Sequence, residues 1–217
     1  MPNKKIVIRP VRDVTEAYSV YDRLQDLLDN NDPDREFIAE RPVSEIKKAI
    51  EDGLFIVCET EDEEMIGSLA LYPLDEDYVM TPGYELGTVM IDKAYRRFRR
   101  KNEGFISHAI SSACILLLVA NRIKLNILAY VRAKNTNPDR VLKACGFNQI
   151  LSDKPPKKKF ELAENCFVRH KEQLQALDFS SDNPFEDDKG NGLCIRFEGW
   201  LIDSTLIAQL PDGPDML

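Results

Sequence analysis

The stretch "YELGTVMIDKAYRRFRRKNEGF" (84–105) runs from a strand pattern directly into a strongly basic turn. Residues 84–91 contain the aromatic and β-branched side chains that favour a β-strand. The segment 104–122 predicts a long apolar helix, and "KLNILAYVRA" (124–133) predicts a second strand. A helix between two strands predicts a βαβ crossover, with the basic turn at the start of the helix. Free N–H groups and positive dipole at a helix start favour phosphate ligands.

The rest of the chain predicts further strands and helices around this crossover. Ahead of it we expect a strand at 5–11, helices at 13–32 and 41–53 (with Ser44 as cap and Gly53 at the end), and an antiparallel hairpin of 54–60 and 65–74. After it we expect a short helix at 137–147 that ends at Gly146, a linker at 152–159, a helix at 160–179, a polar loop and a final strand at 193–203. We therefore expect a core at 1–152 and an extension, helix plus strand, at 153–217.

Composition and charge exclude several classes of protein. The chain has 217 residues and a formal net charge of -8, which argues against a general nucleic-acid coat. Its five cysteines include no C-x-x-C pair, so we expect reduced thiols, no disulfide framework and no metal site. The start lacks the apolar stretch of a signal peptide, and the apolar run at 113–120 is too short to span a bilayer. We expect a soluble, cytoplasmic protein with no membrane partner.

The basic turn has three possible ligands. Arg99, Arg100 and Lys101 suit the phosphates of a small cofactor, because guanidinium groups pair well with phosphate oxygens. A loop that meets only water is a second interpretation. Nucleic acid is a third, less favoured one, since Phe98 stands between two arginine pairs and bases stack on aromatic rings.

Several local patterns together resemble one family, the GNAT superfamily of acetyl-coenzyme A-dependent N-acetyltransferases. The resemblance covers about residues 5 to 151. It lies in "VIRPV" at the start, "MIGSLALY" with Gly67, "YELGTVMIDKAYRR", and "NTNPDRVLKACGF" (135–147). It implies an α/β fold with a mixed, mainly antiparallel sheet, flanked by helices and splayed at an acyl-CoA cleft between 84–91 and 124–133.

The resemblance also implies which residues hold the coenzyme. Family members carry Arg/Gln-x-x-Gly-x-Gly/Ala in the basic turn, and the nearest match is 99–104, with asparagine where the middle glycine is customary. This match implies a lengthened loop, because aligning the motif on Tyr95 and Arg96 leaves no glycine in it. The expected coenzyme-binding residues are Val89, Met90, Ile91, Arg99, Arg100, Lys101, Asn102, Gly104, Phe105 and Asn135.

Two side chains are the candidates for acid–base work. An amine must lose its proton before it attacks a thioester, and Glu85 stands on the strand that lines the acyl group in the family. The family's frequent tyrosine acid is replaced by Leu142, so Tyr130 and Tyr95 are the candidate substitutes, with Tyr130 preferred. The alternative for each is a structural role. For Asn135 it is a turn.

The resemblance therefore implies an N-acyltransferase that moves an acyl group, acetyl in the simplest case, from coenzyme A to a primary amine. The acceptor is a small molecule or a peptide, and the sequence leaves its identity and the oligomeric state open. One alternative is an atypical enzyme of this kind with a different donor or a nucleic-acid substrate. Another is a catalytically inactive module that keeps the fold and binds a partner.

Overall fold

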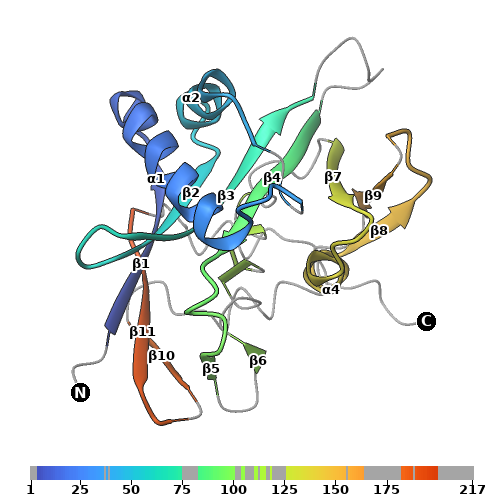
Figure 1. The fold of residues 1–217 in the computed structure, drawn as a ribbon. Helices are drawn as coiled ribbons and strands as arrows, with labels where there is room; N and C mark the ends of the chain where they lie inside the picture. Colours follow the sequence, from blue (N-terminus) through green and yellow to red (C-terminus); the bar gives the residue numbers. More distant parts are fainter. Residues whose placement is uncertain are drawn as a thin grey trace, which may run out of the picture.

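The computed structural model describes most of the chain (Figure 1). The described residues are 4–36, 38, 40–74, 83–100, 104–105, 110–111, 113–115, 118, 126–154, 156–163, 182–187 and 189–199. They form a mixed α/β structure with one large sheet and helices on both of its faces.

Eleven strands make up this sheet. In chain order they are β1 (Lys4–Val11), β2 (Phe55–Thr60), β3 (Met65–Pro73), β4 (Gly83–Ile91), β5 (Arg99–Arg100), β6 (Gly104–Phe105), β7 (Asn126–Arg132), β8 (Phe147–Ile150), β9 (Lys157–Leu162), β10 (Asn183–Glu186) and β11 (Gly192–Phe197). Their spatial order is β6-β5-β10-β11-β1-β2-β3-β4-β7-β9-β8. Within this sheet β1 pairs with β11, and β4 with β7, in parallel, and the other pairs are antiparallel.

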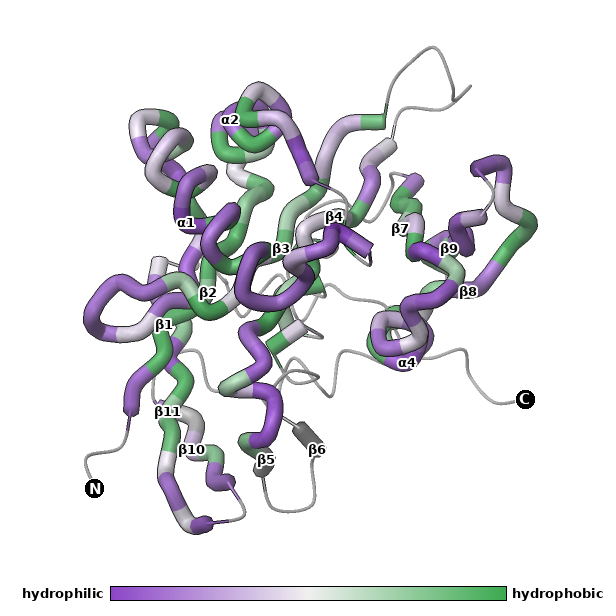
Figure 2. Tube along the Cα trace, viewed as in Figure 1, coloured by the Kyte–Doolittle hydropathy of each residue, from purple (hydrophilic) through white to green (hydrophobic). Residues whose placement is uncertain are grey.

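Two N-terminal helices cover one face of the sheet. A short 3-10 turn (Val14–Glu16) leads into α1 (Ala17–Asn31), and α2 (Val43–Glu51) follows. Each helix buries one apolar stripe at helical spacing, such as Leu24 and Leu28 on α1 and Ile46 and Ile50 on α2. Figure 2 shows this two-sided character, with hydrophilic residues along the outer turns of both helices. The stripes pack with apolar residues of β1 to β4 in a single buried cluster.

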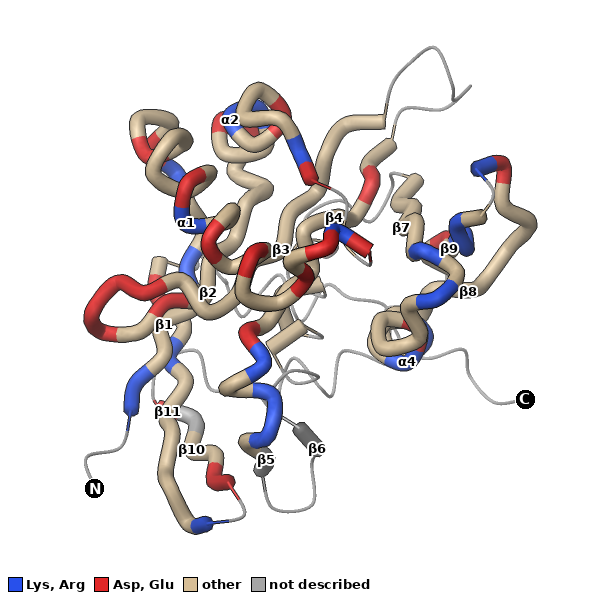
Figure 3. Tube along the Cα trace, in the orientation of Figure 1, with Lys and Arg blue, Asp and Glu red and all other residues tan. Residues whose placement is uncertain are grey.

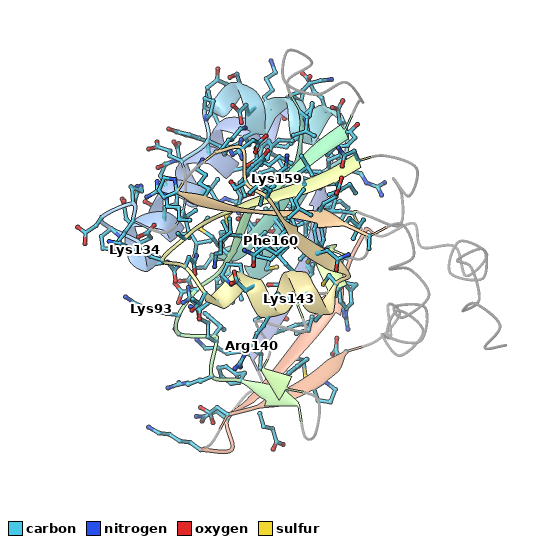
Figure 4. All side chains as sticks on the ribbon, turned by 90° about the vertical axis from the view of Figure 1, so that its right-hand side faces the viewer. Lys93, Lys134, Arg140, Lys143, Lys159 and Phe160 are labelled. Carbon is cyan, nitrogen blue, oxygen red and sulfur yellow. The ribbon has the colours of Figure 1, made fainter. Side chains whose placement is uncertain are left out.

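The second face carries α4 (Asn137–Ala144) and the described helical residues between 110 and 118. Ile115, Val141 and Leu142 join a larger buried cluster that reaches from β11 to β9. Figure 4 looks onto this side, where α4 carries Arg140 and Lys143 and the fully buried Phe160 lies on the strand behind it. Within the described part of the chain, no helix is both long and apolar enough to cross a membrane.

Most predicted elements ahead of residue 150 are confirmed, with two corrections. Gly53 and Gly146 follow their helices with φ of 67° and 83°, the left-handed conformation that commonly ends a helix. The prediction that Ser44 caps the second helix is wrong, because Pro42 holds the cap position and Ser44 lies inside the helix. The expected start of the long helix at Gly104 is also wrong, since β6 begins there.

The region beyond residue 150 differs from the sequence-based expectation in two strands, β9 and β10, the second of which lies in the expected polar loop. The expected helix from residue 164 to 179 lies outside the described residues. Residues 157–162, expected as the end of a linker and the start of a helix, form β9. This strand pairs with β7 on one side and with β8 on the other. The division into 1–152 and 153–217 remains a prediction, and the ladders of β9 cross it. The expected final strand is confirmed by β11, whose Leu193, Ile195 and Phe197 are buried.

Candidate active site

A cleft opens where β4 and β7 separate. Their parallel ladder starts at Gly83 opposite Asn126 and ends at Leu86 opposite Ala129. Past this point the two strands enclose, with neighbouring elements, a cavity of about 420 Å³. Its walls come from β4, β7, α4, the segment after α1 and the helical residues Ser111 and Ile115. The splayed sheet predicted from the sequence is therefore present, and the cleft lies at the predicted pair of strands.

One wall of the cleft contains a β-bulge. The register between β3 and β4 shifts between Ser68 and Ala70, so that Thr88 and Val89 together face Leu69. Thr88 has a φ of 49°, and a β-branched residue seldom adopts this left-handed conformation. The bulge therefore turns the β4 backbone at the level where β7 leaves it.

Glu85 lies at the cleft in a cluster of charged and aromatic side chains. Arg41 donates from Nη2 to Glu85 Oε1 at 2.5 Å and from Nη1 to Glu45 Oε2 at 3.0 Å. Its guanidinium lies 4.6 Å from the centre of the Tyr72 ring, a cation–π geometry. Burial alone would lower the pKa of Arg41, but the charge of Glu85 and the hydrogen bond to Glu45 raise it. Arg41 therefore remains charged and holds the Glu85 carboxylate in place.

Tyr130 lies on β7 at the cleft, and its hydroxyl is already engaged. It donates to Asp153 Oδ1 at 3.0 Å, and Asp153 also pairs with Lys159 at 3.2 Å. Lys154 lies 4.5 Å from the centre of the Tyr130 ring. Burial and the hydrogen bond to Asp153 raise the pKa of the Tyr130 phenol, so it keeps its proton at neutral pH. Tyr95, the other candidate acid, is buried beside Phe98 in the large core.

The segment between α1 and α2 forms a further wall. Asp32 is buried and accepts hydrogen bonds from the backbone N–H groups of Glu36 (2.9 Å) and Ile38 (2.7 Å). Across the cleft, Arg132 of β7 donates to the carbonyls of Arg35 and Glu36. The two polar side chains thus fix the path of this segment and attach it to β7.

Arg96 is the basic side chain of the turn that lines the cleft. It donates from Nε to the Ile91 carbonyl and from Nη2 to Asn31 Oδ1, both at 2.8 Å. Burial lowers its pKa from the usual value, an effect that leaves an arginine charged at neutral pH. Figure 3 shows the run of basic residues that begins at the end of β4. Arg96 is not among the coenzyme-binding residues expected from the sequence, because aligning the family motif on Tyr95 and Arg96 leaves no glycine in it.

The structure brings together six of the predicted site residues. Glu85, Val89, Met90, Ile91, Tyr130 and Asn135 all line the cleft. The remaining residues belong to the basic turn, where the backbones of Arg99 and Arg100 pair with Phe105 and Gly104 in a small hairpin. Arg99 also pairs with Glu186 of β10, so the hairpin joins the opposite end of the sheet from β7. Lys101 and Asn102 lie outside the described residues, and coenzyme binding by this turn stays a prediction.

Phe98 is placed where it cannot stack on a nucleic-acid base. Its side chain is 6% exposed and packs against Tyr95, with 6.3 Å between the ring centres. Phe98, the residue on which the nucleic-acid interpretation depended, is therefore part of the hydrophobic core. Among the residues whose placement is described, no group of three or more His, Cys, Asp or Glu could hold a metal ion.

Three solved structures share this fold with the chain. The NatC complex bound to Gag peptide and CoA aligns with a TM-score of 0.54 at 13% identity, over 73% of this chain and 98% of that one. The GNAT domain of PAT from S. lividans gives 0.51 at 14% identity, over 71% and 88%. An acetyltransferase from Streptococcus agalactiae 2603 gives 0.51 at 16% identity, over 72% and 97%.

These likenesses define the class of fold. No protein-family model matches the sequence, and no curated protein matches it significantly. The chain nevertheless has the GNAT fold, with the open mixed sheet and the cleft between two diverging parallel strands. The resemblance inferred from the sequence motifs is confirmed at the level of the fold.

Proposed function

We propose that the protein is an N-acyltransferase that carries an acyl group from coenzyme A to a primary amine. The observation that carries this proposal is the cleft at the splay of β4 and β7, which is lined by Glu85, Tyr130 and Arg96. The GNAT fold supports it, and so does the CoA present in the structurally similar NatC complex. A fold alone does not fix an activity, so the argument rests on the side chains at the cleft.

The donor is a cosubstrate whose parts match different regions of the cleft. Apolar side chains such as Val89, Val141 and Leu142 suit the coenzyme arm, and Asn135 offers polar contacts beside them. Arg96 suits the phosphates, because its guanidinium is held at the cleft by two hydrogen bonds. Backbone N–H groups of β4 around Val89 to Ile91 polarise the thioester carbonyl in this proposal.

The chemistry then needs one proton acceptor and one proton donor. The amine nitrogen attacks the thioester carbonyl, forming the C–N bond, and the C–S bond breaks as the thiolate leaves. Glu85 takes the proton that the amine releases. Tyr130 turns its hydroxyl from Asp153 to the thiolate and gives it the proton, and the phenolate is reprotonated from solvent.

The ion pair of Glu85 favours one class of acceptor amine. Arg41 competes with a substrate ammonium for the Glu85 carboxylate. An α-amino group has a pKa of about 7.7–8.0 and is partly neutral at physiological pH, whereas a lysine amine near 10.4 is almost wholly charged. We therefore propose an α-amine, such as that of a peptide, ahead of a lysine side chain.

Thermal unfolding with acetyl coenzyme A, coenzyme A and no ligand tests donor binding. A ligand of the native state raises stability by mass action, by about 2.7 kcal/mol at 100 times its dissociation constant. The expected result is a rise in Tm with both ligands. No change at millimolar ligand contradicts the proposal and favours a GNAT-fold module that binds a partner without catalysis.

Calorimetry can separate the two arginine groups of the basic turn. Arg96→Ala should weaken coenzyme A binding by roughly tenfold, because a charge-assisted hydrogen bond contributes about 1.5–3 kcal/mol. The sequence predicts the same for Arg99→Ala/Arg100→Ala. If affinity falls in the Arg96 variant alone, the phosphates bind at the cleft. If it falls in the double variant alone, the hairpin reaches them.

A further inference from the structure

The bulge of β4 is held in place from within the sheet. Thr88, at φ 49°, is 7% exposed, and its backbone carbonyl and its hydroxyl both meet side chains of β3. Ser68 Oγ donates to the Thr88 carbonyl at 2.9 Å. The Tyr72 hydroxyl lies 3.2 Å from Thr88 Oγ1. A backbone conformation that threonine disfavours persists only where its surroundings determine it, and these two contacts supply that constraint.

Burial makes both contacts specific. Ser68 is 3% exposed and Tyr72 is 2% exposed, so a hydroxyl that left Thr88 would lose its partner away from water. The Tyr72 ring cannot easily shift either. Arg41 lies over it, and a Cβ placed on Gly87 would come within 3.0 Å of its edge. The ring, and through its hydroxyl the bulge, therefore has one well-packed position.

The position of the bulge along β4 is what connects it with the cleft. The described ladder between β4 and β7 ends at Leu86, two residues before Thr88. The following residues, Val89 to Ile91, line the cavity. A shift of the Thr88 backbone would therefore move the N–H groups that face the donor.

We propose that Tyr72 and Ser68 are positioning residues, which aim the β4 backbone N–H groups around Val89 to Ile91 at the acyl carbonyl. The inference rests on the proposed function and adds two residues of β3 that do not themselves touch the substrate. Donors preorganised for the developing oxyanion stabilise the transition state, and their effect depends on fractions of an ångström. Strain at Thr88, held by two buried hydrogen bonds, provides that preorganisation.

The test compares hydroxyl-deletion variants that keep the shape of the side chain. Tyr72→Phe retains the ring under Arg41, Ser68→Ala removes the bond to the carbonyl, and Thr88→Val removes the partner of Tyr72. Each should lower kcat by about tenfold or more, with KM for acetyl coenzyme A changed less than about twofold. A misdirected backbone N–H group weakens transition-state stabilisation more than it weakens binding of the coenzyme. Thr88→Ser, which keeps the hydroxyl, should recover most of the loss seen in Thr88→Val.

A spectroscopic measurement reads the same effect without turnover. Difference infrared spectra of bound acetyl coenzyme A, labelled with ¹³C at the carbonyl, report how strongly the carbonyl is polarised. In the wild-type complex the C=O band should lie below that of the free thioester. In Tyr72→Phe it should move back toward the free value. Tyr21→Phe is the matched control, since its hydroxyl bonds Glu40 at 3.2 Å outside the cleft, and its band and kcat should remain as in the wild type.

The double variant Tyr72→Phe/Thr88→Val completes the design. If Tyr72 acts through Thr88, the second substitution adds little to the loss of kcat from the first. A lowered Tm with kcat and the C=O band unchanged would show that the hydroxyls are merely structural and would overturn the inference. Absence of donor binding in the wild type would overturn the proposed function itself, which is a distinct result.

Discussion

Glu85 lies at the cleft, where we propose that it takes the proton of the acceptor amine. Its ion pair with Arg41 orients the carboxylate toward the cleft, and Gly87 leaves room for the guanidinium beside it, since a Cβ there would lie 3.3 Å from Arg41 Nη2. Arg41 therefore helps to fix the position of the Glu85 carboxylate. Substitution of each of its two carboxylate partners separates the role of Glu85 from that of the ion-pair network.

We expect Glu85→Gln to lower the rate of amine acylation by about 10²- to 10⁴-fold near neutral pH, the usual range for general acid–base catalysis. The loss should shrink as pH rises, because the amine then loses its proton unaided. Initial rates across pH 6.5 to about 9.5 provide the measurement, with donor affinity checked by calorimetry. Glu45→Gln is the matched control, since Glu45 also binds Arg41 and should leave the rate nearly unchanged. A Glu85→Gln enzyme that retains its rate at pH 7 would remove Glu85 from the mechanism.

The phenol of Tyr130 offers a pH-dependent observable. Burial and the hydrogen bond to Asp153 raise its pKa, so in Asp153→Asn, where the acceptor loses its charge, the pKa should fall toward the usual value near 10. Ultraviolet titration of phenolate formation measures this, and Tyr130→Phe identifies which of the seven tyrosines gives the signal. An unchanged titration curve in Asp153→Asn would mean that the contact is not formed in solution.

At the residue scale, the side chains that the sequence placed at the cleft belong mainly to strands, and the predicted role of the basic turn stays a prediction. Glu85 and Tyr130 both line the cleft, because a strand fixes where each residue points, and their catalytic roles stay predictions. Arg41 and Asp32, at the ends of the two predicted helices, were missed because tertiary contacts set their places at the cleft. The ion pair that joins Arg41 to Glu85, 44 residues away, is set by tertiary packing.

Among the elements, β4 and β7 form the cleft. Their first residues lie very close together, and the strands diverge from there. A Cβ placed on Gly83 would lie 2.3 Å from the Asn126 carbonyl oxygen, where the ladder starts. Since that neighbour is backbone, it cannot move aside without displacing β7. Gly83 therefore sets how close the two strands lie before they diverge.

We expect Gly83→Ala to lower the free energy of unfolding by about 1–3 kcal/mol, the usual range for overpacking, and to weaken donor binding. Gly87→Ala is the comparison, because its nearest atoms, 3.0 and 3.1 Å away, belong to the Tyr72 side chain. Its effect on stability should be smaller. Urea unfolding of both variants is the measurement, and equal stability of Gly83→Ala and the wild type would contradict the close approach.

The elements that sequence reasoning predicted well have strong local signals. Amphipathic spacing predicted α1 and α2, and glycines marked the ends of α2 (Gly53) and α4 (Gly146). The strand at 157–162 was missed because "KKKFEL" carries three lysines, a composition that favours solvent exposure over a strand. Its place in the sheet depends on pairing with β7 and β8, which local sequence does not encode.

For the whole molecule, the structure indicates that segments beyond residue 152 are part of the main sheet. Phe160 on β9 is fully buried, and Ile195 on β11 is 2% exposed, both in the same cluster as Ile6. We expect Phe160→Ala to lower the free energy of unfolding by about 3–5 kcal/mol. Calorimetric melting is the measurement, with Tyr18→Ala, an exposed aromatic residue, as control. A small effect would show that β9 contributes little to the core.

Truncation after Lys154 tests the same point at a larger scale. It removes β9, β10 and β11, and so exposes the edges of β7, β8, β5 and β1. The expected product is insoluble or molten, with no cooperative melting transition, because a sheet that loses interior strands cannot close its core. A fragment that melts cooperatively would instead confirm 1–152 as an independent core.

The parallel pairing of β1 with β11 has a consequence for biosynthesis. Lys4 pairs with Leu193, so β1 receives one of its two neighbours from a strand that is synthesised long after it. At roughly 5–20 residues per second, translation leaves that flank of β1 bare for roughly 10 to 40 s. An unpaired apolar edge recruits other chains, and a nascent polypeptide with such an edge is a natural client for chaperones. Slow translation of the codons between β1 and β11 would therefore lower the soluble yield of this protein while leaving the stability of the finished molecule unchanged.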